Sequence, residues 1–315
     1  MTHPDKAIVQ ATLADAIGAW ASGDSQRIEQ VVTDDVSLTS SVHGNVLGKA
    51  AVVDALCLNW PQGYVVTLRT TNENFALENG RIVFSGYIYG KLEALPPKRS
   101  EPLMFGAVLV GELELGATVW RFNDLALEIN WVEGKGPLFS KWLEPRGNRF
   151  WLAGDRSPAV VSELNSAWAR LPAGHVLGDR RAEVVEVFMR YIWAMDHADF
   201  ALMRTTLSDD MAGDFPPIGR LTGIHQVIGQ LKNFRQAWPW MQHFCEPLNV
   251  EIDNETDTAE MLLGRIIAQR PETSAGEKLY GAHYRLKLRE DASGWKIFWF
   301  EYIEGWVTFT EHSGL

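Results

Sequence analysis

The sequence predicts an α+β protein made of two tandem copies of one module, each a curved antiparallel sheet wrapped by about three helices. Three observations support this prediction: the length of 315 residues, an internal repeat with a constant offset, and helices that precede the sheet in each copy. At roughly 100–200 residues per domain, this length suits two domains better than one. The composition, 46% hydrophobic and 22% charged, excludes a disordered or fibrous chain.

Charge and cysteine content exclude several classes of partner. The chain has 40 Asp and Glu against 29 Lys and Arg, a net charge of −11, and no basic run, so we expect neither a nucleic-acid nor a membrane partner. The first ten residues lack the pattern of a signal peptide, and the longest uncharged apolar run, Leu103–Gly111, is too short to span a bilayer. Cys57 and Cys245 form neither a disulfide framework nor a metal motif, so a cytoplasmic location is expected.

A repeat with an offset of 175 residues relates the two halves of the chain. The pair Asp34-Asp35 recurs as Asp209-Asp210. With the same offset and no gap, further matches follow in order: Asp24 and Asp199, Ile28 and Met203, Val32 and Leu207, Gly44 and Gly219, Gly48 and Gly223, and Val52-Val53 and Val227-Ile228. Both copies also end alike, at Trp131–Gly134 and Tyr302–Gly305. Matches in this order indicate two copies of one structural unit.

This repeat divides the chain into a first module at 1–144, a linker at 145–179 and a second module at 180–315. Proline and glycine recur through the linker and interrupt regular structure there. A short helix is expected inside it, from Ser157 as N-cap to about Leu171.

In the second module, the predicted helices come first and the strands later. Apolar residues at helical spacing predict the first helix: Val184, Val185, Phe188, Ile192 and Met195. A second helix is expected over about 200–207, a short strand after Asp209-Asp210, and a third helix over 223–236. Four strands are expected near 242–252, 258–269, 278–290 and 295–304.

The last predicted strand is apolar on both faces, with the sequence WKIFWFEYI over 295–303. A sheet with one buried face would alternate apolar and polar residues. We therefore expect helices of the module on one face and a second sheet on the other. That sheet would come from the other module, in an internal pseudo-dimer, or from a second copy of the chain, in a homodimer.

Helices over a bent antiparallel sheet, with an Asp pair and two glycines between the second and third helices, resemble the NTF2-like (SnoaL-like) superfamily. This resemblance covers both copies and implies cone-shaped modules with a pocket between sheet and helices. Segments of the second copy resemble the ketosteroid isomerase branch: Arg190–Ile192, Asp196, Asp199 and Asp209-Asp210. Other segments resemble the scytalone dehydratase branch: Met241–Cys245, Asn249–Glu251, Asp257–Ala259 and 279–300. Because the superfamily includes many non-enzymes, the fold alone assigns no function.

The dehydratase resemblance implies that His243 is a catalytic base. An imidazole can remove a proton beside a carbonyl and return it to a departing hydroxyl. Asp196, at the end of the first helix, matches the acidic partner of that base, which would fix its tautomer and stabilise the imidazolium. The structural alternatives are a hydrogen-bonded core histidine and a carboxylate that caps the loop to Asp199.

The isomerase resemblance implies that Tyr191 is an oxyanion donor. A buried phenol can donate to a developing enolate oxygen, although Tyr191 could also be one more core aromatic. Tyr284 and His283 both lie near the place of a second donor. Adjacent strand residues face opposite ways, so only one of them can line the pocket, and we favour Tyr284.

Further residues are predicted to contact the substrate. Asp214 stands where the isomerase branch carries its carboxylate base, but its spacing from the Asp pair is one residue short, which could turn it to the other face. Phe215 follows at a place where the dehydratase branch binds substrate. Alternation along the last strand directs Phe298, Phe300 and Tyr302 toward the pocket and Glu301 away from it.

The first copy lacks this polar set. At the positions that match the three proposed catalytic residues it carries Ala16, Ala21 and Val65, and Thr39 matches Asp214. If these positions were only structural, the copies should differ at random. The first module is therefore predicted to be non-catalytic and the second to hold the active site.

These residues predict a lyase or isomerase with dehydratase-type acid–base chemistry. The sequence has no HxH or HExxH motif, no acidic cluster at metal spacing and no glycine-rich phosphate loop, so we expect neither metal nor cofactor. The expected partner is a small aromatic or polycyclic carbonyl or phenol compound, which loses water or a fragment such as formaldehyde. The alternatives are a non-catalytic protein that binds an apolar ligand and a structural component of a complex.

Overall fold

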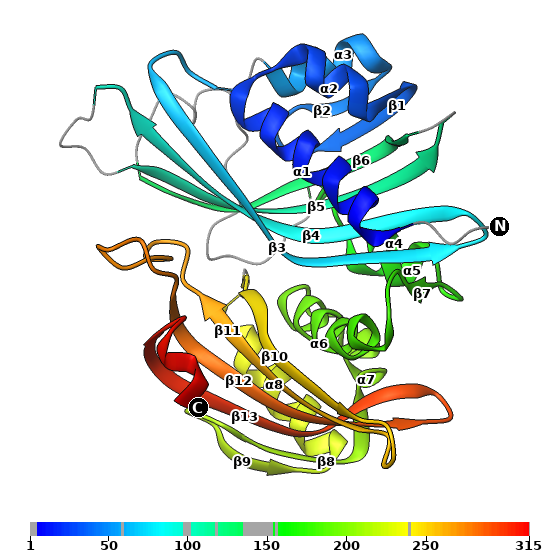
Figure 1. The fold of residues 1–315 in the computed structure, drawn as a ribbon, viewed down its shortest axis with the longest axis vertical. Helices are drawn as coiled ribbons and strands as arrows, with labels where there is room; N and C mark the ends of the chain where they lie inside the picture. The colour runs from blue at the N-terminus through cyan, green and yellow to red at the C-terminus, as the bar shows by residue number, and fades with distance from the viewer. Residues whose placement is uncertain are drawn as a thin grey trace. The chain divides into compact units, whose positions relative to one another are not determined.

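A computed structural model describes residues 5–57, 60–96, 102–116, 119–134, 154, 157–238 and 241–314. The chain forms two compact units, residues 1–177 and 178–315 (Figure 1). Each unit begins with the same series of elements, two helices, two strands, one helix and four strands. This order confirms the α+β class and shows that both units are built from the same series of elements, as the repeat predicted.

The first unit contains one seven-stranded sheet in the order β2-β1-β6-β5-β4-β3-β7. Its helices are α1 (Lys6–Ser22), α2 (Ser25–Val31), α3 (Lys49–Cys57), α4 (Ser162–Asn165) and α5 (Ala167–Arg170). Its strands are β1 (Val32–Ser40), β2 (Gly44–Leu47), β3 (Tyr64–Glu78), β4 (Arg81–Ala94), β5 (Leu103–Leu115), β6 (Trp120–Glu133) and β7 (His175–Val176). Strands β1 and β6 run parallel, and the other neighbours are antiparallel.

The second unit contains one six-stranded sheet in the order β10-β11-β12-β13-β8-β9. Its helices are α6 (Arg180–Asp196), α7 (Phe200–Arg204), α8 (Ile224–Gln236) and the short 3₁₀ helix η2 (Glu311–Gly314). Its strands are β8 (Leu207–Phe215), β9 (Gly219–Thr222), β10 (Phe244–Asp253), β11 (Thr258–Ile266), β12 (Leu279–Asp291) and β13 (Gly294–Thr308). Strand β8 already includes the Asp pair and so begins earlier than predicted.

The repeated residues occupy equivalent structural positions in the two units. Asp24 and Asp199 are the N-caps of α2 and α7, and each side chain accepts a hydrogen bond from a backbone N–H three residues later. Gly48 and Gly223 precede the third helix of their units with φ of +85° and +82°, a backbone conformation that L side chains rarely adopt. The repeat therefore preserves the residues that start helices and turn the chain.

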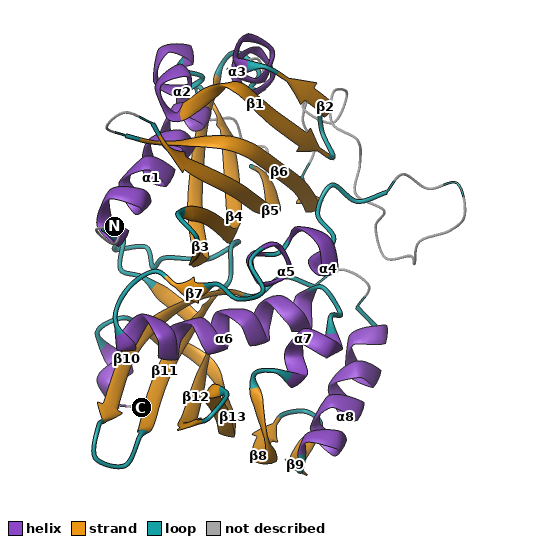
Figure 2. Cartoon of the chain, turned by 90° about the vertical axis from the view of Figure 1, so that its right-hand side faces the viewer, coloured by secondary structure: helices purple, strands orange, loops and turns teal. Residues whose placement is uncertain are grey.

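Helices α6, α7 and α8 lie along one side of the second sheet (Figure 2). We call the sheet face that packs against them the inner face. Its buried residues are Met211, Phe215, Cys245, Ala259, Met261, Leu263, Tyr284, Leu286, Leu288, Ile297 and Phe300. This face forms the core of the unit, because it buries the apolar side chains of α6 and α8.

The opposite, outer face of the same sheet carries aromatic side chains covered partly by arginines. The guanidinium of Arg220 lies 4.8 Å from the ring centroid of Trp299, and that of Arg289 lies 5.4 Å from the centroid of Phe298. A bulge in β13 between Ile297 and Trp299 leaves Phe298 outside the regular alternation. Cation–π contacts with arginines thus explain how some aromatic side chains of β13 can lie on the outer face. The second sheet expected over this face stays a prediction.

The segment predicted as a linker contributes structure to the first unit. Residues 145–153, 155 and 156 lie outside the described residues, but 157–177 form two helical turns, α4 and α5, and strand β7, which pairs with β3. The expected single helix from Ser157 to Leu171 is divided at Ser166, whose side chain caps α5 by accepting from the N–H of Ala169. Serine favours this cap over a helix interior because its hydroxyl competes for backbone hydrogen bonds.

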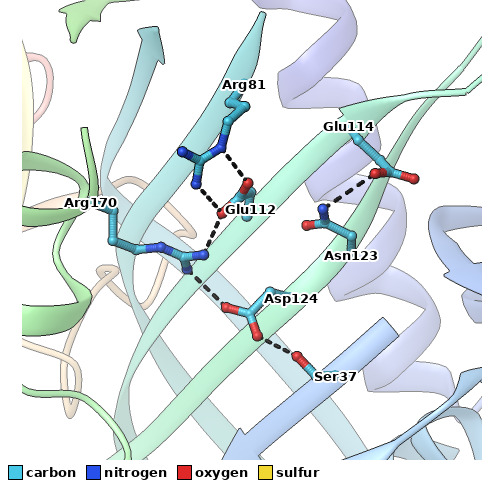
Figure 3. Close-up of polar contacts among 7 residues, drawn as sticks. All are labelled: Ser37, Arg81, Glu112, Glu114, Asn123, Asp124 and Arg170. Atoms are coloured by element: carbon cyan, nitrogen blue, oxygen red, sulfur yellow. Dashed lines mark hydrogen bonds and ion pairs between the residues drawn. The ribbon is translucent and has the colours of Figure 1, made fainter. Parts of the chain in front are cut away.

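An ionic network connects α5 to the first sheet (Figure 3). Arg170 pairs with Glu112 on β5 and, at 2.9 Å, with Asp124 on β6. Glu112 also accepts two hydrogen bonds from Arg81, at 2.7 and 2.9 Å. The hydrogen bond from Arg81 lowers the pKa of Glu112, and the charge of Arg170 adds to this against the effect of burial. The network therefore holds the predicted linker against the sheet.

Replacing Arg170 with Met is expected to destabilise the first unit by about 1–2 kcal/mol, between the values for exposed and buried ion pairs. The cause is the loss of two ion pairs by a side chain that is only 18% exposed. Urea unfolding measures the change, and amide hydrogen exchange over 167–177 should show it locally. Arg27→Met is the control, since the exposed pair of Arg27 and Asp15 should contribute little. Equal stability of the two variants would contradict this role of Arg170.

Within the described residues, no helix has both the length and the apolar character required to cross a membrane.

Candidate active site

Asp196 lies at the C-terminal end of α6, and its side chain is completely buried. Arg235 of α8 fixes this helix end, because its guanidinium donates hydrogen bonds to the carbonyl oxygens of Met195, at 3.3 Å, and Asp196, at 2.8 Å. A cation at a helix C-terminus also interacts favourably with the helix dipole. Arg235 therefore fixes the end of α6 from which the Asp196 carboxylate extends.

His243 lies directly before β10 and makes two contacts with the Asp196 carboxylate. Its backbone N–H donates to Oδ2 at 2.8 Å, and its ring Nδ1 lies 2.5 Å from Oδ1. The His243 side chain is 12% exposed, whereas that of Asp196 is 0% exposed. The structure thus brings together the two residues that the sequence analysis selected as base and acidic partner.

The charge of Asp196 determines which tautomer His243 adopts. Burial raises the pKa of Asp196, but the charge of His243 and its two hydrogen bonds outweigh that effect, so the pKa lies below its ordinary value. Asp196 is therefore a carboxylate at neutral pH and can only accept hydrogen bonds. Nδ1 of His243 must then carry the proton, which leaves Nε2 as the ring nitrogen that can accept one from a substrate.

Tyr191 lies on α6 five residues before Asp196 and is 3% exposed. Its ring centroid is 5.5 Å from that of Phe300 on the inner face. Burial raises its pKa far above the ordinary value, and the charge of Asp196 adds to that rise. The phenol therefore stays protonated at neutral pH and can donate a hydrogen bond.

The predicted aromatic contacts lie together on the inner face. Phe215 stacks on Phe300 with centroids 4.8 Å apart. Tyr284 lies 5.7 Å from Phe300 and 5.5 Å from Tyr302. Phe300 and Tyr302 therefore lie on the inner face, as alternation predicted, and Glu301 lies on the outer face, where it forms an ion pair with Arg285 at 2.8 Å. The same alternation is wrong for Phe298, which lies on the outer face because of the bulge in β13. A substrate contact of Phe300 and Tyr302 stays a prediction.

The register of β12 decides between Tyr284 and His283. Tyr284 pairs with Tyr302 and belongs to the inner face, as we favoured, whereas His283 pairs with Ile303 and points to the outer face. There His283 approaches Tyr280 edge-on, with centroids 5.6 Å apart. The proposed substrate contact of His283 is therefore wrong, because successive strand residues face opposite sides.

Asp214 also lies on the wrong face for a substrate contact. It pairs with Glu301 in the parallel register of β8 and β13, and its side chain is 42% exposed and 3.8 Å from Arg220. The spacing from the Asp pair to Asp214 is one residue short, and this turns Asp214 to the outer face, as the sequence indicated.

The sequence did not identify two further polar residues on the inner face, Cys245 and Arg265, as candidates for the site. We call the pair His243 and Asp196 the dyad. Cys245 follows His243 by two residues and is buried on the inner face, where burial raises its pKa strongly. Arg265 on β11 pairs directly with Cys245 across the strands. A signal for Arg265 existed, because alternation along β11 places it on the same side as Leu263 and Met261.

The matching positions of the first unit are apolar in the structure as well. Ala16 packs against the hydrophobic core of that unit, and Val65 is 43% exposed on β3. Trp60 donates a hydrogen bond from Nε1 to the carbonyl of Trp20 at 2.6 Å, and its ring lies 5.4 Å from that of Trp20. The absence of an equivalent catalytic function in this unit stays a prediction.

In the described part of the chain, no three His, Cys, Asp or Glu side chains gather in a group that could hold a metal ion.

Comparison with known proteins assigns the class of the second unit. Residues 179–300 match the family model of the SnoaL-like domain. The second unit therefore contains a SnoaL-like domain, as the resemblance in the sequence predicted. A search of curated proteins gives no match.

Several solved structures are similar in fold to part of this chain. A hexachlorocyclohexane dehydrochlorinase, LinA type 2, has 19% identity and a TM-score of 0.37 over 45% of this chain and 94% of its own. LinA type 3 from Novosphingobium barchaimii has 16% identity and a TM-score of 0.35 over 42% and 90%. A protein provisionally assigned as a scytalone dehydratase from Novosphingobium aromaticivorans has 9% identity and a TM-score of 0.37 over 46% and 94%.

Proposed function

We propose that the second unit is a lyase or isomerase that moves a proton beside a carbonyl group of its substrate and needs no cofactor. The observation that carries this proposal is the contact of His243 with the buried carboxylate of Asp196. A histidine oriented by a carboxylate is suited to general-base work. The SnoaL-like family match is compatible with this chemistry but does not select it, since the same fold also serves proteins without catalytic activity.

In the proposed dehydration, Nε2 of His243 removes the proton on the carbon beside the carbonyl. The C–H electron pair forms an enolate, whose oxygen accepts a hydrogen bond from the Tyr191 hydroxyl. The enolate then re-forms the carbonyl and expels the β-hydroxyl, which receives the proton from Nε2 and leaves as water. Asp196 stabilises the imidazolium that exists between these steps.

Two other outcomes use the same residues. In an isomerisation of a β,γ-unsaturated carbonyl compound, Nε2 removes the α-proton to form a dienolate and returns the proton to its γ-carbon, which shifts the double bond into conjugation with the carbonyl. In the release of formaldehyde, Nε2 removes the hydroxyl proton of the hydroxymethyl group, the C–O bond becomes the carbonyl of formaldehyde as the C–C bond breaks, and the electron pair of that bond forms the enolate, whose α-carbon then takes the proton back from Nε2. The aromatic residues of the inner face, Phe215, Tyr284, Phe300 and Tyr302, favour an aromatic or polycyclic substrate.

A tetralone with a hydroxymethyl group beside its carbonyl tests this proposal, because it can lose either water or formaldehyde. The wild-type protein in deuterated water should exchange the α-proton or form one of the two products, as followed by NMR. Tyr191→Phe should lower the rate by about 10²-fold, a usual loss for one oxyanion donor. Tyr280→Phe is the control, since that hydroxyl hydrogen-bonds Glu246 on the outer face.

A protein that binds the tetralone and neither exchanges nor converts it, or one in which Tyr191→Phe reacts at the wild-type rate, would contradict the proposal. Binding without reaction would favour the non-catalytic carrier.

A further inference from the structure

Arg265 places a cation on the inner face of the second sheet, within an otherwise apolar and aromatic core. It lies on β11, where it pairs with Cys245 of β10 on one side and Ala282 of β12 on the other. Both neighbours are buried, and Arg265 itself is partly buried. Directly paired residues point to the same face of a sheet, so the guanidinium lies on the same side as His243's partner, Asp196.

Two of the residues beside Arg265, Tyr284 and Cys245, are neutral at neutral pH. Burial lowers its own pKa, but Tyr284, Cys245 and a hydrogen bond to Tyr302 reverse that effect, so it stays charged. Burial raises the pKa of Tyr284 and of Cys245 well above their ordinary values. These neighbours therefore offer oxygen and sulfur atoms but no negative charge.

The other strand arginines of this unit are paired with acids. On the outer face, Arg285 pairs with Glu301 at 2.8 Å, and Arg289 pairs with Asp210. Among the described residues, no Asp or Glu oxygen lies within ion-pair distance of Arg265. A partly buried charge without a counterion is costly, and replacing it with an apolar residue of similar size would relieve that cost. Arg265 therefore differs from the paired arginines of this unit in having a charge that is available to a negatively charged ligand.

We propose that Arg265 binds a carboxylate group of the substrate, so that the substrate is an aromatic or polycyclic carboxylic acid. This proposal rests on the proposed function for the identity of the ligand as a substrate. The guanidinium can hold both carboxylate oxygens in a bidentate contact, with the Tyr302 phenol beside it. Cys245 follows His243 by two residues and faces Arg265, so the anchored acid presents its adjacent carbons to the dyad.

The experiment compares naphthoate with naphthamide, which have the same ring system and differ in charge. Isothermal titration calorimetry with the wild-type protein should show that naphthoate binds at least tenfold more tightly. Arg265→Met should abolish this preference and keep the affinity for naphthamide. Arg285→Met is the matched control, because it removes an arginine of the adjacent strand from the outer face, and it should retain the preference.

A second variant protects the test against a folding defect. Arg265→Lys keeps the charge but cannot form a bidentate contact, so it should keep a reduced preference for naphthoate. Circular dichroism checks that each variant is folded. Equal affinity of the wild type for the two compounds, or an unchanged preference in Arg265→Met, would overturn the proposal.

His243→Gln separates this proposal from the proposed function. Its preference for naphthoate should equal that of the wild type, because the carboxylate contact does not use the imidazole. If the wild type shows the preference but converts neither the tetralone nor a tetralone carboxylic acid with the same hydroxymethyl group, the carboxylate site stands and the enzymatic proposal fails. A preference lost in His243→Gln but kept in Arg265→Met would assign the anion to His243 and refute the role of Arg265.

Discussion

Replacing His243 with Gln should lower kcat by about 10³-fold or more, within the range that general-base catalysis supplies. Glutamine can still donate a hydrogen bond to Asp196, which now accepts from Nδ1 at 2.5 Å and from the backbone N–H at 2.8 Å. It has no nitrogen that can take up a proton. The loss should therefore fall on the chemical step, and substrate affinity should change little. Steady-state kinetics with the tetralone measures both quantities.

His225→Gln provides the control for His243→Gln. His225 is exposed on α8, so the same substitution there should leave kcat and KM unchanged. Because the backbone N–H of His243 is retained in the glutamine variant, its thermal stability should stay close to that of the wild type. A His243→Gln protein with wild-type kcat would remove the base from the mechanism, and with it the central step of the proposed function.

Much of the fold could be predicted because the repeated residues have local physical roles. Asp24 and Asp199 cap helices, and Gly48 and Gly223 adopt positive φ. Such roles depend on the nearest few residues, so they leave a visible pattern in the sequence. The linker was predicted less well, because the contact of Arg170 with β5 and β6 joins residues far apart in the chain.

The candidate site divides in the same way. His243 and Asp196 could be paired through a family resemblance that supplies a contact across 47 positions. The sheet face to which Asp214 points could not be predicted from local sequence. It depends on the register between β8 and the distant parallel strand β13, and that register contains a shift. A one-residue shift turns a side chain to the other face of a sheet. Arg265 was missed because an arginine in a strand is usually solvated, and only the pairing with Cys245 shows that it faces the core.

Replacing Asp196 with Asn should lower kcat by about 10²–10⁴-fold and also destabilise the second unit. An amide has one oxygen acceptor, whereas Asp196 accepts from both the backbone N–H and Nδ1 of His243. One of these donors would then face the amide NH₂, or the imidazole would adopt the other tautomer, with its proton on Nε2. In the second case Nε2 of His243 carries a proton and cannot accept one from the substrate. Wrong-tautomer variants of histidine–aspartate pairs show a decrease in kcat of this size.

The stability effect should be about 1–3 kcal/mol, the cost of leaving a buried donor without its partner. Urea unfolding measures it, and hydrogen exchange of peptides from α6 and β10 should locate it. The pKa of Asp196 is lowered in the folded state, so its stabilisation is fully present above the ordinary pKa of an aspartate. That stabilisation is lost as pH falls through the lower, folded-state pKa. The difference in stability between wild type and Asp196→Asn should therefore be largest near neutral pH and shrink in acid.

Asp199→Asn is the matched control for both effects. Asp199 lies three residues further along the chain and is also buried, at 7% exposed, but its side chain caps α7 by accepting from the N–H of Leu202. Asparagine is an equally good N-cap, so stability and kcat should stay near the wild-type values. If Asp196→Asn behaved like this control, the carboxylate would be a local cap rather than the group that orients His243.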